Sequence, residues 1–434
     1  IMKLNKDIEK FVNNFLKKKE KSKFIPGTTP IAASTKLIGN YEIKNMISAS
    51  LEGWLTTGRY NDEFEKKLSN FLKVKHLITI NSGSSANLVA FSSLTSHLHK
   101  EKAVKPGDEI ISVAAAFPTT VNPIFQNGAV PVFVDVKLPT YNIDENLIEQ
   151  AITEKTKGIM IAHTLGNPFN LDKVTKICKK NNLWLVEDNC DALGSKYNGK
   201  FTGTFGDVAT LSFYPAHHIT MGEGGAIFTN NFRIKRVAES FRDWGRDCYC
   251  EPGKENTCNK RFEWKLGKLP FGYDHKYIYS HLGYNMKITD MQAACGLGQL
   301  ERLEGFIEKR KKNLNFLKKR LLNLEEEFLL PVAEKNSDPS WFGFPITLKK
   351  KCKIKRVDII KKLTAKKIGT RLLFGGNLVK QPAYMNRKFK ISGNLEVTDN
   401  IMNNTFWVGI HPSLGEEELD YIGKSLEENI RQNP

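Results

Sequence analysis

The chain has 434 residues, 40% of them hydrophobic, and a formal net charge of +18 at neutral pH. This composition excludes collagen-like, repetitive and low-complexity proteins, and the length suffices for a large core divided between two domains. The lysines are spread along the chain, often beside glutamates, with a dense patch only at residues 17–23, which favours solvated helix faces over a nucleic-acid-binding surface.

Hydropathy and cysteine content indicate the cellular compartment in which the protein is expected. No apolar run approaches the roughly 20 residues of a membrane span, and the lysine-rich N-terminal stretch lacks the apolar core of a signal peptide. We therefore expect a cytoplasmic protein that engages neither a membrane nor nucleic acid. The seven cysteines, an odd number, favour free thiols or metal ligands over a disulfide framework.

The N-terminal third predicts helices and then a strand. Helices are expected at residues 7–24 (amphipathic), 41–54 and 62–72. An apolar strand at 77–80 leads into the turn Asn81-Ser82-Gly83-Ser84-Ser85 and a helix at 86–98. A strand, a Gly/Ser turn and a helix present free amides and a helix N-terminus to a phosphate, although the same pattern often only connects the two elements.

The middle of the chain predicts a largely parallel sheet. Four apolar runs favour strands, at residues 109–113, 130–136, 159–162 and 183–186. Phe117 follows the first run, at a position where an aromatic ring is usually part of the core. The last run is followed by Glu187-Asp188-Asn189-Cys190-Asp191. Carboxylates at the carboxyl end of a buried parallel strand lie where doubly wound sheets bind ligands, though an aspartate there can also cap a helix.

A loop with two histidines joins the next two predicted strands, at 208–213 and 226–228. It holds His217 and His218 between two buried elements, which suits side chains that must be positioned without being packed away. An imidazole carries protons near neutral pH but cannot form a Schiff base with an aldehyde. A lone histidine in such a turn is more often structural, and this remains our interpretation of His218.

Three cysteines lie in a segment that breaks the alternation of strands and helices, at residues 242–274. From Cys190 the intervals are 57 residues to Cys248, one to Cys250 and seven to Cys258. Four thiolates suit either zinc or a two-iron two-sulfur cluster, and their spacing alone does not choose between them. The other three cysteines fall in regular patterns and are expected to be buried apolar side chains: Cys178, Cys295 and Cys352.

The C-terminal part predicts a second, smaller unit. A loop containing Asn285 precedes a helix expected from residue 290 to 324, and a small α/β domain is expected from about residue 330. The predicted organisation is a helical extension over 1–30, a large domain over 31–300 that includes the cysteine-containing segment, and a linking helix with a small domain over 301–434.

Together the Gly/Ser turn, Asp188 and the Ser212 loop resemble the DegT/DnrJ/EryC1 sugar aminotransferase family, with fold type I of the pyridoxal phosphate enzymes. The resemblance extends over the chain beyond about its first 25 residues. It implies an α/β fold in which a mostly parallel, doubly wound large domain is followed by a smaller C-terminal α/β domain, and it implies a homodimer.

The resemblance also implies a cofactor site. It assigns the cofactor-binding positions to Gly83, Ser84, Phe117, Asp188, Asp191, Ser212 and Asn285. Asp188 would pair with the pyridine nitrogen, and Asn285 would reach the phosphate across the subunit interface. The family lysine lies five residues after the serine, where this chain has His217. This replacement implies pyridoxamine 5'-phosphate held without a covalent link, with His217 as the catalytic proton carrier.

The cysteine intervals, together with His217, resemble the CDP-4-keto-6-deoxyglucose 3-dehydrase branch of the family. This branch binds a 2Fe-2S cluster, which implies that Cys190, Cys248, Cys250 and Cys258 are its ligands. The implied reaction is C3 deoxygenation of a nucleotide-linked 4-keto-6-deoxyhexose, the CDP derivative, in 3,6-dideoxysugar biosynthesis. Electrons would come from an NAD(P)H-dependent iron-sulfur flavin reductase.

Two alternatives stand beside this interpretation. One is a redox-independent, pyridoxamine phosphate-dependent 3-dehydratase of another nucleotide sugar. The other is a non-catalytic regulator with a zinc or iron sensor site on the same fold. Retention of Asp188, Ser212 and the Gly/Ser turn argues against the regulator, because a non-catalytic fold has little need for all three.

Overall fold

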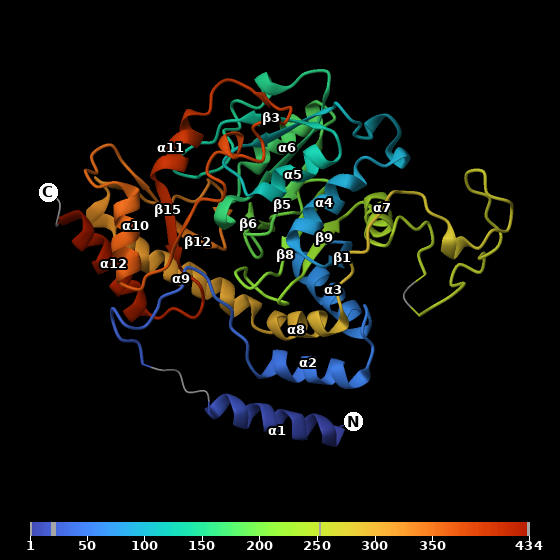
Figure 1. Ribbon diagram of the computed structural model, residues 1–434, viewed down its shortest axis with the longest axis horizontal. Coiled ribbons are helices and arrows are strands. Elements are labelled where there is room, and N and C mark those ends of the chain that lie inside the picture. The colour runs from blue at the N-terminus through green and yellow to red at the C-terminus, as the bar shows by residue number, and fades with distance from the viewer. Residues whose placement is uncertain (1, 19–22, 251–252, 432–434) are drawn as a thin grey trace.

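The computed structural model describes residues 2–18, 23–250 and 253–431. Its main layer is an eight-stranded sheet (Figure 1). In spatial order the strands are β1 (His76–Ile80), β9 (Gly225–Thr229), β8 (Val208–Ser212), β5 (Trp184–Asp188), β4 (Thr156–Ala162), β2 (Glu109–Val113), β3 (Val130–Val134) and β14 (Lys390–Ile391). β9 runs antiparallel to both of its neighbours, and the other pairs are parallel.

Helices cover both faces of this sheet, which explains why its strands are continuous apolar runs. One face packs on α4 (Gly83–Ser93), α5 (Pro118–Gln126) and α7 (Phe232–Arg242), and α6 (Leu171–Lys180) packs on the opposite face, where its Cys178 lies beside Leu185 of β5. The opposite face also packs on α3 (Arg59–Leu72) and α8 (Asp290–Leu300), with α2 (Asn40–Glu52) outside them. Along β8, Ala209 and Leu211 join the second core while Val208 joins the first, as the two-residue period of a strand requires.

A second sheet lies in the C-terminal part, on the left of Figure 1. Its four antiparallel strands are, in order, β10 (Phe328–Leu329), β12 (Gly343–Leu348), β15 (Thr405–Gly409) and β13 (Thr370–Leu372). The helices of this part are α9 (Leu303–Arg320), α10 (Arg356–Ala365), α11 (Glu396–Asn404) and α12 (Glu416–Arg431). A separate apolar core fills the space between this sheet and its helices.

Short elements complete the chain. A three-stranded sheet joins β11 (Ser337–Asp338), β6 (Lys196–Tyr197) and β7 (Lys200–Phe201). The 3-10 helices are η1 (His97–Lys102), η2 (Glu149–Ala151), η3 (Thr164–Gly166), η4 (His275–Tyr277), η5 (Leu322–Leu324) and η6 (Leu378–Lys380). Between α7 and η4 the described residues form neither helix nor strand beyond single bridges, and this segment projects from the body in Figure 1.

The predicted strands are confirmed within one or two residues at most ends, and three helix predictions are wrong. The helix expected over 290–324 is broken between α8 and α9. Arg302 sits at the break, where its guanidinium pairs with the fully buried Glu42 and donates to the Leu37 carbonyl. The helix expected over 86–98 ends at Ser93, and η1 follows it.

The N-terminal helix also differs from its prediction. It is α1 (Met2–Lys18), and it lies on α2 at the lower edge of Figure 1. Ile8 and Val12 are buried, whereas Phe11 and Phe15 are exposed. The predicted end at residue 24 is wrong, because Phe24 packs on Tyr421 near the small sheet; residues 19–22 lie outside the described residues. Among the helices described, none is long and apolar enough to cross a bilayer.

His411, two residues after β15 of the small sheet, holds the N-terminal segment at Ala32 against that sheet. Its Nε2 lies 2.9 Å from the Ala32 carbonyl oxygen and its Nδ1 lies 2.7 Å from Ser413 Oγ. Burial, with a smaller contribution from the Arg310 charge, lowers the pKa of His411 to about 4, and the hydrogen bond with the Ala32 carbonyl opposes this change. Because the unfolded chain then binds a proton that the folded chain does not, stability falls as the pH drops from about 6.5 towards 4.

We therefore expect His411→Gln to reduce the pH dependence of folding. Urea denaturation should show a smaller difference between pH 7.5 and pH 5 than in wild type, by roughly 2 kcal/mol in the free energy of unfolding. His97→Gln is the matched control, because His97 is exposed, and it should keep the wild-type difference. An unchanged pH dependence in His411→Gln would contradict this account of the buried imidazole.

Candidate active site

The start of α4 meets the end of β8. Ser82 caps the helix, with its Oγ accepting from the Ser85 amide at 3.0 Å. A Cβ on Gly83 would lie 2.4 Å from the Cβ of Ser212, so only glycine allows this approach. Ser84 is exposed, with its Oγ 3.1 Å from Thr119 Oγ1. The geometry brings together the predicted Gly83, Ser84 and Ser212 at a helix N-terminus, where backbone amides and the helix dipole favour an anion.

Asp188 lies at the carboxyl end of β5 in a buried hydrogen-bond network. Its Oδ2 accepts from Asn87 Nδ2 at 2.8 Å and from Thr120 Oγ1 at 2.6 Å. Its Oδ1 accepts from the Cys190 amide at 3.1 Å, and Thr210 Oγ1 donates to Asn87 Oδ1 at 2.7 Å. These three partners, with Thr210 holding Asn87 in place, keep the carboxylate in one orientation at the ligand-binding edge of the sheet.

The loop between β8 and β9 is closed by the pairing of Ser212 with Gly225. His217 lies within it, with its side chain 15% exposed and its Nδ1 3.4 Å from Asp191 Oδ1. Its ring centroid is 5.2 Å from that of Phe342. Burial lowers the pKa of His217 to about 4, an effect that Asp188 opposes, so the imidazole is uncharged at neutral pH.

His218 points elsewhere. It is 3% exposed, and its Nε2 lies 2.8 Å from the Ser340 carbonyl oxygen. Burial lowers its pKa well below the ordinary value. The side chain therefore anchors the loop to the segment that precedes β12, in agreement with its structural interpretation.

Arg310 brings a buried positive charge to this region. Its Nη1 donates to the carbonyl oxygens of Phe342 at 2.9 Å and Trp341 at 3.3 Å. Burial, with a further effect of Asp188, raises the pKa of Asp191 to about 8, and the Arg310 charge opposes this rise. Burial lowers the pKa of Arg310 to about 10, and Asp191 opposes this change, so each of the two side chains affects the other.

Two predicted residues lie at the periphery. Phe117 precedes α5 with 51% of its surface exposed, and its ring meets Phe374 edge to face at 6.4 Å. Asn285 is exposed and pairs through its backbone with Asp243. Its side chain makes no hydrogen bond with any residue that the structure describes, so the role assigned to it across a subunit interface stays a prediction.

Sequence reasoning missed Asn87, Thr120, Thr210 and Arg310. Asn87 and Thr210 are polar positions within apolar elements, and that contrast was the available signal. Arg310 lies three residues after Ile307 and four after Phe306, on the buried side of α9. A cation on an apolar helix face indicates a buried charge, but the sequence does not say which groups it would face.

The structure gathers three of the four predicted metal-ligand cysteines. Cys248, Cys250 and Cys258 line one small pocket, where Thr257 Oγ1 donates to Cys250 Sγ at 3.1 Å. Cys190 does not line this pocket: it follows β5, and its Sγ lies 3.9 Å from Thr210 Oγ1 of β8. Burial raises the pKa of the Cys190 thiol well above its ordinary value.

The expected four-cysteine cluster is therefore not assembled in this structure. Within residues 2–18, 23–250 and 253–431, no group of three or more His, Cys, Asp or Glu side chains has the spacing to hold a metal ion. The physical reason is that Cys190 is fixed at the end of β5, while the other three thiols lie in the projecting segment of Figure 1. Of the remaining cysteines, Cys178 and Cys295 are buried as expected, and Cys352 is only half-buried.

Comparison with known proteins identifies the family to which this chain belongs. Residues 37–427 match the DegT/DnrJ/EryC1/StrS aminotransferase family. The lipopolysaccharide biosynthesis protein RfbH of Salmonella typhimurium is 62% identical over 93% of this chain and 93% of its own length. The dTDP-4-dehydro-2,6-dideoxy-D-glucose 3-dehydratase of Saccharopolyspora spinosa is 47% identical over 97% of this chain and 91% of its own.

One solved structure is similar over most of this chain. The GDP-4-keto-6-deoxy-D-mannose-3-dehydratase of Escherichia coli with bound hydrated PLP superposes with a TM-score of 0.81 and 29% identity. The match covers 91% of this chain and 99% of that one. These likenesses confirm the expected α/β fold of type I.

The contact between Gly83 and Ser212 gives a direct test of the site geometry. Gly83→Ala should lower the free energy of unfolding by about 1–3 kcal/mol, because the new methyl group overpacks against the end of β8. Denaturant titration of Gly83→Ala, Ser84→Ala and the double variant Gly83→Ala/Ser212→Gly checks this. Ser84→Ala should match wild type, and the double variant should recover part of the loss. Equal stability of Gly83→Ala and wild type would contradict the close approach.

Proposed function

This chain belongs to the DegT/DnrJ/EryC1/StrS aminotransferase family, and on that premise we propose that it removes the C3 hydroxyl of a nucleotide-linked 4-keto-6-deoxyhexose with pyridoxamine 5'-phosphate as cofactor. The observation that carries the proposal is His217 at the position of the family lysine, placed beside Asp191 and Phe342. The 3-dehydratase relatives support the reaction. The CDP sugar is our proposed substrate, from the cysteine pattern.

The residues present fit the cofactor. The amides at the start of α4, with Ser84 and Ser212 beside them, suit a phosphate. The Asp188 carboxylate, fixed by its hydrogen bonds, suits a protonated ring nitrogen. The half-exposed ring of Phe117 offers an aromatic surface. When bound, pyridoxamine phosphate supplies an amine that condenses with a ketone and a ring that accepts electrons.

The chain's own residues then supply orientation and proton transfer. The hydrogen bonds from Asn87 and Thr120 hold the Asp188 carboxyl group in one orientation by satisfying its acceptor positions. His217, uncharged at neutral pH, takes up a proton through an imidazole nitrogen and returns it. The aromatic ring of Phe342 packs beside the imidazole and excludes water from that side.

Deoxygenation at C3 requires more than the loss of water. Conversion of the dehydrated sugar to the 3-deoxy ketone consumes two electrons and two protons. We propose that an NAD(P)H-dependent iron-sulfur flavin reductase supplies the electrons. A 2Fe-2S cluster on Cys190, Cys248, Cys250 and Cys258 remains part of the proposal. The four thiols do not fit a cluster as they stand, because Cys190 lies beside Thr210 and outside the pocket of the other three, so we derive no electron-transfer step from them.

The redox-independent 3-dehydratase is the second candidate, and the separation of Cys190 from the other thiols favours it. On that account the three cysteines of the projecting segment would be structural or would hold zinc. For either candidate we propose a homodimer that Asn285 bridges. We also propose a cytoplasmic location, where nucleotide-linked sugars are available.

His217 is the first residue to test. His217→Asn should lower dehydration of the keto sugar by ~10²–10⁴-fold, because an amide cannot exchange a proton near neutral pH. Product formation is followed by NMR, and cofactor retention by absorbance. His218→Asn is the matched control: it should lower thermal stability while the folded fraction turns over near the wild-type rate. Full activity in His217→Asn, or loss of activity only in His218→Asn, would contradict the assignment.

Metal content separates the two candidate functions. If four cysteines share one cluster, Cys190→Ala and Cys250→Ala should both lose iron, sulfide and visible absorbance after anaerobic purification. Cys178→Ala, which removes a buried thiol outside the set, should keep them. Retention of the metal in Cys190→Ala with loss in Cys250→Ala would establish a three-thiol site, and zinc in the wild-type protein would contradict the iron-sulfur proposal.

A further inference from the structure

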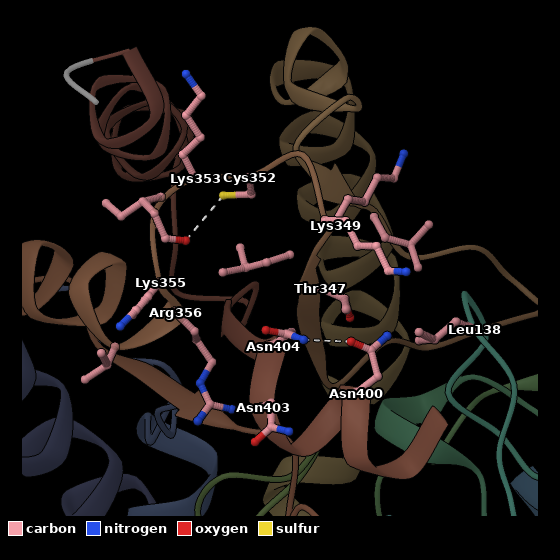
Figure 2. A pocket seen from close by; sticks show the side chains of 15 residues that line it. Leu138, Thr347, Lys349, Cys352, Lys353, Lys355, Arg356, Asn400, Asn403 and Asn404 are labelled. Atoms are coloured by element: carbon pink, nitrogen blue, oxygen red, sulfur yellow. Dashed lines mark hydrogen bonds between the residues drawn. The ribbon is translucent and has the colours of Figure 1, made fainter. Parts of the chain in front are cut away.

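A cavity of about 690 Å³ opens in the C-terminal part of the chain (Figure 2). Its walls come from the end of β12, the following loop, the start of α10 and the C-terminal half of α11, with Leu138 from the large sheet's side. In Figure 2, Cys352 and Lys355 stand across the space from Lys349, and Asn400 and Asn404 close its lower side. Its volume lies within the range of sites that bind small molecules.

The charges of this cavity have one sign. Its cationic lining residues are Lys349, Lys350, Lys353, Lys355 and Arg356, and no aspartate or glutamate lines it. Residues 349–356 contain six cations, so the expectation of a single dense lysine patch near the N-terminus is wrong. Lys351, which does not line the cavity, pairs with Glu326. A concave surface with cations of one sign concentrates anions.

Hydrogen-bond donors of the backbone and of Arg356 lie beside the lysines of the cavity. At the start of α10 the Asp358 amide donates to the Lys355 carbonyl at 3.0 Å, whereas the Arg356 and Val357 amides have no intrahelical partner and receive no hydrogen bond from the Lys355 side chain. Arg356 is held by the backbone carbonyls of Met402 and Thr405, and burial lowers its pKa. A guanidinium anchored to carbonyls and not neutralised by a carboxylate keeps its charge available to a ligand.

The remaining walls are uncharged. Apolar contact is offered by Leu348, Leu329 and Ile354, and amide groups by Asn400, Asn403 and Asn404. Asn404 Nδ2 donates to Asn400 Oδ1 at 2.7 Å, which fixes the amide pair on α11. A ligand that matches this surface carries phosphate charge at one end and a larger body with both apolar faces and hydrogen-bonding groups.

We propose that this cavity binds a nucleotide-sized diphosphate ester. The phosphates lie against the start of α10 and the surrounding lysines, and the uncharged body lies on the apolar and asparagine walls. The site is distinct from the active site, because the two lie at opposite ends of β12. Phe342, just before the strand, contacts His217, whereas Leu348, its last residue, lines the cavity. At ~3.3 Å per residue these positions are roughly 20 Å apart.

Cys352 provides a reporter within the cavity, because its half-buried thiol lines the wall. Holoenzyme is treated with N-ethylmaleimide, with and without CDP or inorganic pyrophosphate, and alkylation of the Cys352 peptide is measured by mass spectrometry. At a ligand concentration ten times Kd, mass action predicts ~10-fold slower labelling. The rate of keto-sugar dehydration, measured in the same samples, reports binding at the active site separately.

Variants test the cations. Lys353→Glu/Lys355→Glu should abolish protection of Cys352, and the isosteric Asn404→Asp should weaken it at least severalfold, with the dehydration rate unchanged. Lys312→Glu/Lys361→Glu, the same charge change at exposed positions outside the cavity, should keep protection. No protection by either probe, or equal protection in Lys353→Glu/Lys355→Glu, overturns the proposal. Protection only by phosphatidylglycerol vesicles also overturns it and identifies a membrane-binding surface.

Discussion

The buried carboxylate of Asp188 ties together the elements that build the site. It accepts hydrogen bonds from α4 through Asn87 and from α5 through Thr120, and Thr210 links the same network to β8. A buried polar group is costly unless its hydrogen-bonding positions are satisfied. The Asp188 carboxyl group therefore constrains where α4 and α5 lie on the sheet. The approach of Gly83 to Ser212 follows from this arrangement, because α4 begins where β8 ends.

The reactive side chain depends on contacts between the two sheets. His217 is held in a loop whose ends are paired strands, while its ring faces Phe342 and its neighbour His218 bonds to Ser340. Arg310 crosses the same boundary from α9. The C-terminal part of the chain therefore contributes to the environment that leaves the imidazole uncharged, through Phe342 and Arg310, although the histidine itself belongs to a loop of the large sheet. The packing of the C-terminal part against the large sheet therefore affects proton transfer by His217.

The projecting segment and the basic cavity differ from the site in how they are held. The segment carries its three thiols outside the packed cores and outside regular secondary structure. The cavity, by contrast, is framed by β12, α10 and α11, all of which contribute to or border a buried core. A ligand at the cavity would meet a surface already formed, whereas a cluster shared with Cys190 would require the segment to approach the end of β5.

The sequence by itself determined the strands, the loop that carries His217 and the position of Asp188, because apolar runs and turn residues act locally and the period of two distinguishes a strand from a helix. Tertiary structure decided the rest. The break before α9 follows from the pairing of Arg302 with Glu42, residues 260 apart in sequence. The partners of Asp188, the burial of Arg310 and the separation of Cys190 from the other thiols all depend on which elements meet in space. Spacing in sequence fixes no distance between residues on different elements, so these features appear only when the chain is folded.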